Sequence, residues 1–309
     1  CDGAVHGPFT PAKRHSNRYP NAKVDIPEDI YPPRNGKPEY SRTKEQWIPG
    51  PDGIPMLKSG KFSGRTVSGK FIHGTDIHSL ERQYHQGVLA IDEGVGQLIR
   101  ALKETGQYEN TLIVYGADQG IAWGQKGFQM KLAPYDGTIR GPLIVSMPKK
   151  FPTGKVCSKP VGGADLVPTF FKAAGLDLPW KMHGRDLTPL LTNPERKDWN
   201  SPLLLAHTGM SFGEDCDVII DMKDDPIYQK QRVPWWISLR TDRYKYIRNL
   251  LPGETEELYD MKNDPDEIKN LAIGKNHLLL LRKLRKKTIR ELQQTDCAFS
   301  QKMPPVNNP

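Results

Sequence analysis

One long stretch of the chain, residues 76–105, carries apolar residues at helical spacing. Within SLERQYHQGVLAIDEGVGQLIRALKETG the apolar side chains recur every three or four positions, and Gly106 supplies a stop signal. Two shorter runs, TLIVYGA (111–117) and GPLIVSMP (141–148), are apolar throughout, which is typical of strands buried on both faces. The segment DLVPTFFKAAGL (165–176) predicts another helix. This order of helices and buried strands predicts an α/β fold with a mostly parallel sheet.

The pattern changes near residue 195. The segments PLLLAHT, WWISLRTDRYKYIRN and EELYDMKNDP read as short strands joined by turns, and residues 276–295 form an amphipathic, basic helical pattern. We therefore predict two parts: residues 1–195 in the α/β domain and residues 196–309 in a smaller α+β subdomain. In the second part we expect a four-stranded antiparallel sheet with the 276–295 helix packed on it. Residues 1–70 are rich in Pro, Gly, Lys and Arg and predict a long loop region with short elements.

Composition narrows the range of partners. The 309 residues carry a net charge of +8, but they contain no motif of a nucleic-acid-binding domain, so we expect no nucleic-acid partner. We interpret the charge of the 276–295 helix as a solvated face. No apolar run approaches the about 20 residues that a membrane span requires. The 4 cysteines are scattered without a C-x-x-C pair, so a zinc site is not predicted.

The strand at 111–117 ends in an unusual group of polar residues. Asp118 and Gln119 follow its apolar run directly, and Gly120 allows a tight turn behind them. Ligands of open α/β sheets bind beyond the carboxyl ends of the strands. A carboxylate and an amide oxygen are hard donors that suit Ca²⁺, with Mg²⁺ as the alternative ion, rather than zinc. Taken alone, an Asp at such a position is more often a cap or turn residue.

The wider context of this strand resembles the sulfatase family of the alkaline-phosphatase superfamily. ADQGIAWGQKGFQMKLAPYDGTIRGPLIVSMP is similar to the family's strand ending in S-D-[HNQ]-G, its glycine-rich loop, its lysine and its R-x-P-L-I-V segment. AVHGPFTPAKRH resembles the family's H-x-P-F-x-P segment, and GADLVPTFFKAAGL, HGRDLTPLL, LRTDRYKYIRN and ELYDMKNDPDEIKNLA resemble later segments in the same order. The resemblance implies an alkaline-phosphatase-like fold, in which helices sandwich a mostly parallel sheet.

The resemblance also implies roles for individual residues. Asp118 and Gln119 would supply half of a Ca²⁺ site, Lys131 would place a positive charge on the sulfate, and His6 would contact the sulfate or act as general acid. Three further residues are expected to contact substrate: Lys126, His207 and Trp235. Lys126 stands where many relatives have His, and His207 is equally consistent with a structural polar role. Trp235 and its neighbour Trp236 would point to opposite faces of a strand, so at least one belongs to the core.

The nucleophile of the family is not found in this sequence. Sulfatases use a formylglycine made from a Cys or Ser in C/S-x-P/A-x-R, and no such segment occurs in the 309 residues. The chain therefore resembles the C-terminal portion of a sulfatase. We expect formylglycine only in a missing N-terminal half, which would be its partner in the fold, and we expect the chain alone to be inactive.

The resemblance gives a function with two alternatives. The first expectation is metal-dependent hydrolysis of sulfate esters of a carbohydrate or an aryl alcohol, in a periplasmic or secreted protein. The long loop of residues 30–75 suits a polyanionic sulfated glycan. The alternatives are a phosphonate or phosphate ester hydrolase of the same superfamily and a catalytically incomplete fragment that binds glycan. The nucleophile segment would separate the first two, since phosphatase chemistry favours a Thr or Ser beside a second metal site.

Overall fold

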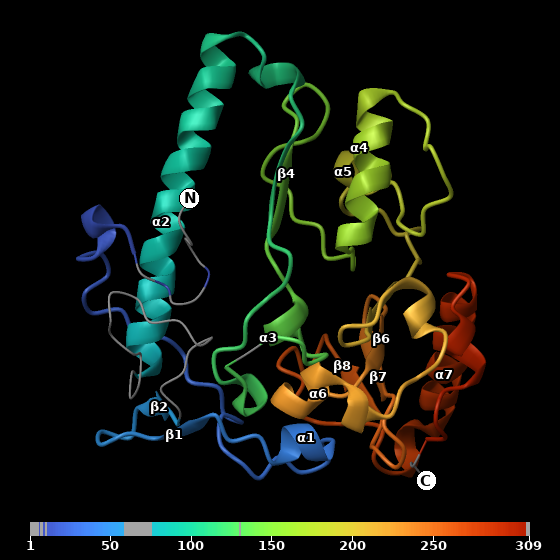
Figure 1. Cartoon of the computed structure of the whole chain (residues 1–309). Coiled ribbons are helices and arrows are strands. Elements are labelled where there is room, and N and C mark those ends of the chain that lie inside the picture. The colour runs from blue at the N-terminus through green and yellow to red at the C-terminus, as the bar shows by residue number, and fades with distance from the viewer. Residues whose placement is uncertain (1–5, 7–8, 10, 59–75, 130, 307–309) are drawn as a thin grey trace.

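A 28-residue helix, α2 (Ile77–Glu104), runs along one side of the molecule (Figure 1). The structure is a computed structural model that describes His6, Phe9 and residues 11–58, 76–129 and 131–306. Asp76 caps α2 by accepting a hydrogen bond from the Ser79 N–H, and Gly106 follows the helix with a positive φ of 69°. The helix predicted at 76–105 is thus confirmed. Part of its apolar stripe is uncovered, because Leu98 is 68% exposed.

The two predicted apolar strands form a separate two-stranded sheet. β3 (Ile113–Gly116) pairs with β4 (Leu143–Ser146), but the pair is antiparallel, with Ile113 opposite Ser146. Between the strands lies a loop whose one α-helix, α3 (Asp136–Ile139), has four residues, and β4 returns beside β3 in the opposite direction. A parallel pair needs a crossover that brings the chain back to the same end of the sheet. In the part of the chain that is described, every strand pair is antiparallel, so the mostly parallel sheet is not found there.

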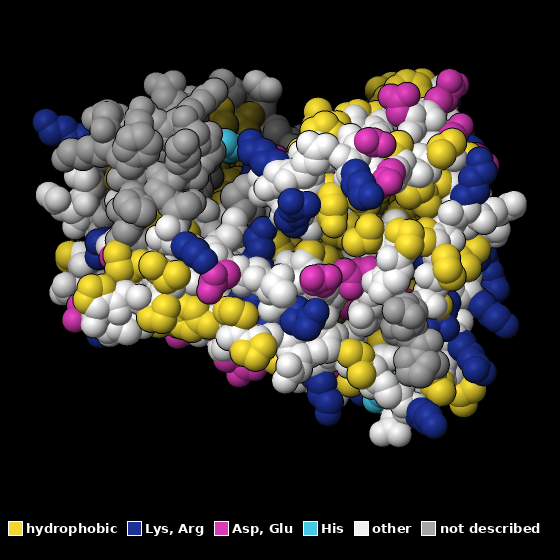
Figure 2. All heavy atoms as spheres, turned by 60° about the horizontal axis from the view of Figure 1, so that its bottom comes forward, with side chains coloured by type: hydrophobic (Ala, Val, Ile, Leu, Met, Phe, Trp, Pro, Cys, Tyr) yellow, Lys and Arg dark blue, Asp and Glu magenta, His cyan; other side chains and the backbone are white. Residues whose placement is uncertain are grey.

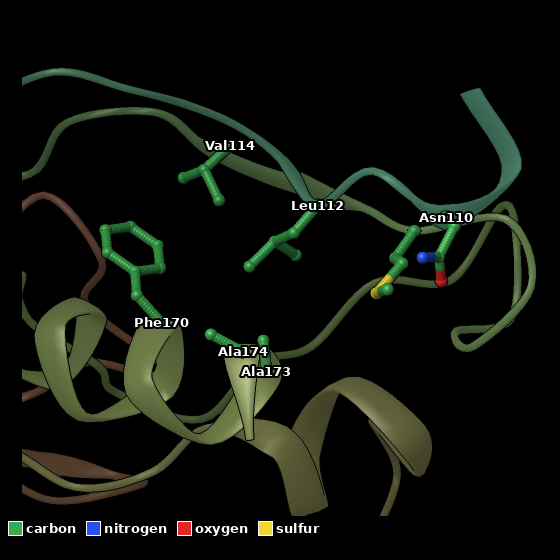
Figure 3. A pocket seen from close by; sticks show the side chains of 7 residues that line it. Asn110, Leu112, Val114, Phe170, Ala173 and Ala174 are labelled. Carbon is green, nitrogen blue, oxygen red and sulfur yellow. The ribbon is translucent and has the colours of Figure 1, made fainter. Parts of the chain in front are cut away.

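The β3–β4 sheet is also less covered than its sequence predicts. Ile144 is 63% exposed. Helix α4 (Leu166–Ala174) lies beside the sheet (Figure 1), and a groove is lined by side chains of both. The groove has a volume of about 520 Å³, and Figure 3 shows apolar side chains of both elements facing it. Its lining consists of Asn110, Leu112, Val114, Met147, Phe170, Ala173 and Ala174. An apolar groove of this kind is typical of a surface that binds another protein segment or a ligand.

The C-terminal part contains the predicted four-stranded antiparallel sheet. Its strands lie in the order β5 (Leu203–His207), β6 (Trp236–Arg240), β7 (Tyr244–Asn249) and β8 (Glu257–Asp260). Helix α7 (Leu278–Gln293) packs on one face of this sheet. Phe128 and residues 132–135 pack on the opposite face, against Trp236, Ile247 and Tyr259. The remaining helices and strands are short: α1 (Glu39–Arg42), β1 (Trp47–Pro49), β2 (Pro55–Leu57), α5 (Thr188–Thr192) and α6 (Pro226–Gln231).

Buried charges join the two parts of the chain. The Lys245 ammonium on β7 is 1% exposed and lies 2.8 Å from the Asp136 carboxylate and 2.7 Å from Glu267. Lys37, from the N-terminal segment, donates a 2.6 Å hydrogen bond to the Tyr259 hydroxyl, and burial lowers the pKa of Lys37 to about 8. The Lys245–Asp136 and Lys37–Tyr259 contacts cross the predicted boundary near residue 195. They hold the loop between β3 and β4, and the N-terminal segment, against the C-terminal sheet. Within the described ranges, no helix is long and apolar enough to cross a membrane.

Candidate active site

The end of β3 is held in place by close backbone packing. Ala117 donates its N–H to the Pro142 carbonyl at 3.3 Å, which extends the strand pair by one residue. A Cβ at Gly120 would lie 2.7 Å from the Arg140 carbonyl oxygen and 3.0 Å from that of Gly137, so only glycine fits. Asp118 is exposed between these two fixed points. The backbone at Asp118 is therefore held by the β3–β4 sheet on one side and by the backbone of α3 on the other.

The donors at this tip have the chemistry of a hard-cation site. Among the contacts of the described residues, none involves the Asp118 carboxylate or the Gln119 amide, so both groups are available to a ligand. Carboxylate and amide oxygens are the ligands that Ca²⁺ prefers. No group of three or more His, Cys, Asp or Glu side chains with metal-binding geometry occurs in the described part of the chain. The pair fits a calcium site as part of a larger donor set.

Lys131 stands at the start of a well-fixed stretch of loop. The next residue, Leu132, has a positive φ of 81°, and its carbonyl oxygen accepts a 2.7 Å hydrogen bond from the Trp236 indole N–H. Ala133 and Tyr135 are buried in the core against β6–β8. The half-buried Lys131 thus extends from a backbone that the C-terminal sheet holds in position.

The His6 segment docks on the loop that follows β3. Phe9 donates its N–H to the His6 carbonyl at 3.1 Å, so the two residues belong to one turn. The Phe9 ring is 2% exposed and lies 5.3 Å from the ring of Trp123 and 5.6 Å from that of Tyr84. Trp123 belongs to the loop after Asp118. The structure therefore brings the His6 turn to the loop that carries Asp118 and Gln119, while the exposed His6 side chain remains open to solvent.

Lys126 has surroundings that differ from the sequence expectation. It is 1% exposed and has a positive φ of 55°, and its ammonium lies 3.1 Å from the Asp29 carboxylate. The same ammonium donates a hydrogen bond to the Asp266 carbonyl. All these partners are protein groups, and they enclose the charge. Lys126 therefore joins the loop to the N- and C-terminal parts, and we do not propose it as a substrate contact.

Trp235 is likewise placed in the core rather than at a sugar-binding surface. It is 0% exposed, and its indole N–H donates a 2.5 Å hydrogen bond to the Asp225 carboxylate. Its neighbour Trp236 is 4% exposed, since loop 128–135 covers that face of the sheet. Neither ring is open to a sugar, which corrects the expectation that Trp235 stacks on substrate.

His207 lies at the end of β5, behind the Lys131 loop. Its ring is 5.9 Å from the ring of Trp236, its partner in the strand register. Burial lowers the pKa of His207 and so favours the neutral imidazole, although the nearby Asp225 carboxylate opposes this shift. Its Nε2 atom is buried without a hydrogen-bond partner among the described residues. His207 therefore contacts the candidate site through Trp236.

Sequence reasoning missed the residues that hold the loop after Lys131. Besides its ion pair with Lys245, Asp136 donates its backbone N–H to the Glu267 carboxylate at 2.6 Å. Burial opposes ionisation of Asp136, but the Lys245 ammonium outweighs it, so the pKa of this carboxyl is lowered. Lys245 and Glu267 are 109 and 131 positions from Asp136, and no local pattern reveals such a contact.

The known proteins that resemble this chain include sulfatases and a phosphonate ester hydrolase. The model of the sulfatase family matches residues 3–176, more than half of the chain. The N-acetylglucosamine-6-O-sulfatase of Bacteroides thetaiotaomicron is 28% identical over 233 residues, which cover 75% of this chain and 38% of that protein. The phosphonate monoester hydrolase of Silicibacter pomeroyi is 26% identical with a TM-score of 0.60, over 72% of this chain and 43% of that chain.

One solved structure matches nearly the whole chain. It is a complex of a protein with its substrate, D-glucosamine-2-N,6-O-disulfate, with a TM-score of 0.72 and 22% identity over 95% of this chain. The match covers 65% of that chain. The chain spans about half, or less, of the length of the curated relatives it matches. At this identity the structure shows a common fold, of the alkaline-phosphatase-like kind.

Proposed function

The chain belongs to the sulfatase family, and from this premise we propose that the protein hydrolyses sulfate esters of a carbohydrate. The observation that carries the proposal is the match to the sulfatase family over residues 3–176, a range that includes His6, Asp118, Gln119 and Lys131. A sugar with a 6-sulfate is the first candidate, because the relative from Bacteroides thetaiotaomicron is named for that substrate. Periplasmic or secreted location stays a prediction.

Each of these residues has a task that follows from the charge of the ester. We propose that the Lys131 ammonium neutralises the sulfuryl oxygens, and that its fixed backbone limits the reorganisation this requires. His6, exposed on its docked turn, gives a proton to the leaving oxygen. Asp118 and Gln119 would hold Ca²⁺, with Mg²⁺ as the alternative, which supplies positive charge beside the sulfate when bound. His207 is proposed to position the loop through Trp236 rather than to touch the sulfate.

The nucleophile is proposed to lie outside these residues. No C/S-x-P/A-x-R segment occurs in the 309 residues, so formylglycine has to come from another segment of the same fold. We expect no turnover of 4-nitrocatechol sulfate or glucosamine 6-sulfate by this chain alone in Ca²⁺. A longer protein that supplies the segment is expected to turn over both. Turnover by the 309 residues that Lys131→Ala abolishes, while the exposed-lysine control Lys150→Ala retains it, would contradict this.

Phosphonate or phosphate ester hydrolysis is the second candidate. It is favoured by the likeness to the phosphonate monoester hydrolase of Silicibacter pomeroyi. The two candidates differ in the ratio of kcat/KM for an aryl sulfate and for the matching aryl phosphonate, measured on one preparation. A ratio above one supports the sulfatase, and a ratio below one supports the phosphonate hydrolase. Binding of sulfated sugar without turnover of either ester by the longer protein would instead support a glycan-binding role.

The groove between β3–β4 and α4 is proposed to receive the missing strands of the same fold. Its apolar lining and the 41% exposure of Phe170 support this, as does the 65% coverage of the matched solved structure. We expect the 309-residue chain to self-associate, with a mass by light scattering above its 34.9 kDa, and Phe170→Lys, at the groove lining, to reduce this. Leu279→Lys, at an 82% exposed leucine of α7, is the matched control. A monodisperse monomer would contradict the proposal.

A further inference from the structure

Helix α7 presents a continuous basic face to solvent. Its apolar residues Leu281, Leu284 and Leu292 are buried against the C-terminal sheet and the chain that follows the helix. At about 100° per residue, the basic residues fall within one arc on the opposite side of the helix. Figure 2 shows Lys and Arg side chains along the right-hand edge, the side on which Figure 1 places α7. The face consists of Arg282, Lys283, Lys286, Lys287 and Arg290.

These five residues, the α7 basic face, lack acidic partners. Among the ion pairs of the described residues, none involves any of the five, whereas Arg285 on the same helix pairs with Glu256 at 2.5 Å. Exposed cations elsewhere often do have such partners, as in Arg14 with Glu93 and Lys181 with Asp296. The positive charge of the α7 basic face is therefore left for solvent or for an external anion.

The arrangement also works against the helix itself. Arg282 and Lys286, Lys283 and Lys287, and Lys286 and Arg290 are like-charged pairs four residues apart, which destabilise a helix. The first turn of α7 holds no acidic residue that would favour the helix dipole. Unfavourable charge pairs within a helix are expected where the surface serves a function. Here a bound anion would neutralise the lysine and arginine charges that repel one another.

We propose that the α7 basic face binds a sulfated polysaccharide, as an anchoring site separate from the Lys131 loop. The choice of polymer rests on the proposed function, because a polymeric substrate carries many sulfates beside the one that is cleaved. The site is separate because α7 covers one face of the β5–β8 sheet while residues 132–135, which follow Lys131, pack on the other. Cations on successive turns lie about 5.4 Å apart along the helix and form a row for a linear polyanion.

Other anionic partners fit this face less well. Helix α7 contains no aromatic residue on which a nucleotide base could stack. A membrane surface would require several exposed apolar side chains beside the basic ones, and on α7 only Leu279 is a large hydrophobic residue exposed to this degree. A sulfated polysaccharide needs neither, because its binding is dominated by charge.

The test compares two variants with equal loss of charge in the longer protein. Arg282→Gln/Lys286→Gln/Arg290→Gln keeps good helix formers on α7, and Lys149→Gln/Lys150→Gln/Lys197→Gln removes three exposed lysines elsewhere. Binding of heparin, of desulfated heparin and of single-stranded DNA is measured by calorimetry at several salt concentrations. The α7 variant is expected to bind heparin about tenfold more weakly, with a salt slope smaller by about two to three. The control is expected to stay within about twofold of the parent.

The outcomes separate this proposal from the proposed function. Equal weakening in both triple variants, or no preference of the parent for heparin over desulfated heparin, overturns the anchoring site. Binding to DNA as tight as to heparin, and lost in the α7 variant, assigns the face to nucleic acid and also overturns it. Turnover of a small sulfate ester is expected to be the same in both variants. Failure of turnover in the parent with intact heparin binding refutes the proposed function and leaves the anchoring site standing. Unchanged melting temperatures verify folding.

Discussion

Replacing Asp118 with alanine is expected to lower kcat/KM for a sulfate ester by about a thousandfold in the longer protein. Asp118 is the one carboxylate at the tip of β3, and it is exposed with no protein partner among the described contacts. Removing it takes away the charged donor of the proposed Ca²⁺ pair and leaves Gln119 alone. The backbone is expected to stay in place, because Ala117 and Gly120 hold it on both sides.

The metal provides a readout that does not depend on turnover. Calcium affinity, measured by calorimetry, is expected to fall by more than tenfold in Asp118→Ala and less in Asp118→Asn, which keeps an oxygen donor. Asp92→Ala, at an exposed carboxylate of α2, is the matched control and is expected to leave both activity and affinity unchanged. Unaltered calcium affinity in Asp118→Ala would show that this tip does not bind the metal.

Replacing Lys245 with methionine is expected to lower the free energy of unfolding by about 3–5 kcal/mol. The Lys245 ammonium faces both Asp136 and Glu267, and the Glu267 side chain is 2% exposed. Without the ammonium, two carboxylates remain in a low-dielectric region with no cation between them. Adding Glu267→Gln to the variant is expected to recover part of the loss, because it removes one of the two unpaired charges.

Urea unfolding measures this effect, and a surface pair supplies its control. Lys181 pairs with Asp296 at 3.3 Å, with both side chains more than 70% exposed, so Lys181→Met is expected to change the free energy of unfolding by less than about 1 kcal/mol.

The lowered pKa of Asp136 adds a test of pH dependence. Its contribution is present above the unfolded pKa of about 4 and is lost as pH falls through the lower folded value. This acid loss should be smaller in Lys245→Met, and equal acid limbs would contradict the pairing.

The sequence predicted the local elements well because their signals are local. The apolar spacing, Asp76 and Gly106 define α2, and the turn chemistry after residue 195 led to the four-stranded sheet. The direction in which β3 meets β4 was wrong, since it depends on the path of residues 117–142 rather than on either strand. The continuous apolar run of β4 predicted a strand buried on both faces, but the exposed Ile144 shows that one face is open to solvent.

The candidate site was predictable in its residue types but not in its surroundings. The assignment of Asp118, Gln119 and Lys131 to the site rests on the family pattern and stays a prediction, which the experiments above test. Lys126 is enclosed by Asp29, 97 positions away in the chain, and such a partner leaves no trace in a motif. Alternation along the strand predicted that at least one of Trp235 and Trp236 is buried, and both are, because the sheet is covered on its two faces.

The hydrogen bond from the Trp236 indole to the Leu132 carbonyl has a consequence for how such proteins diverge. The C-terminal sheet holds the backbone beside Lys131 in position, so substitutions in that sheet are expected to change the proposed activity without altering any of the proposed site residues. Truncation after residue 195 is expected to remove this hydrogen bond and loosen the loop, while every motif of the first 195 positions stays intact. The last third of the chain would then act as a support for residues that it does not itself supply.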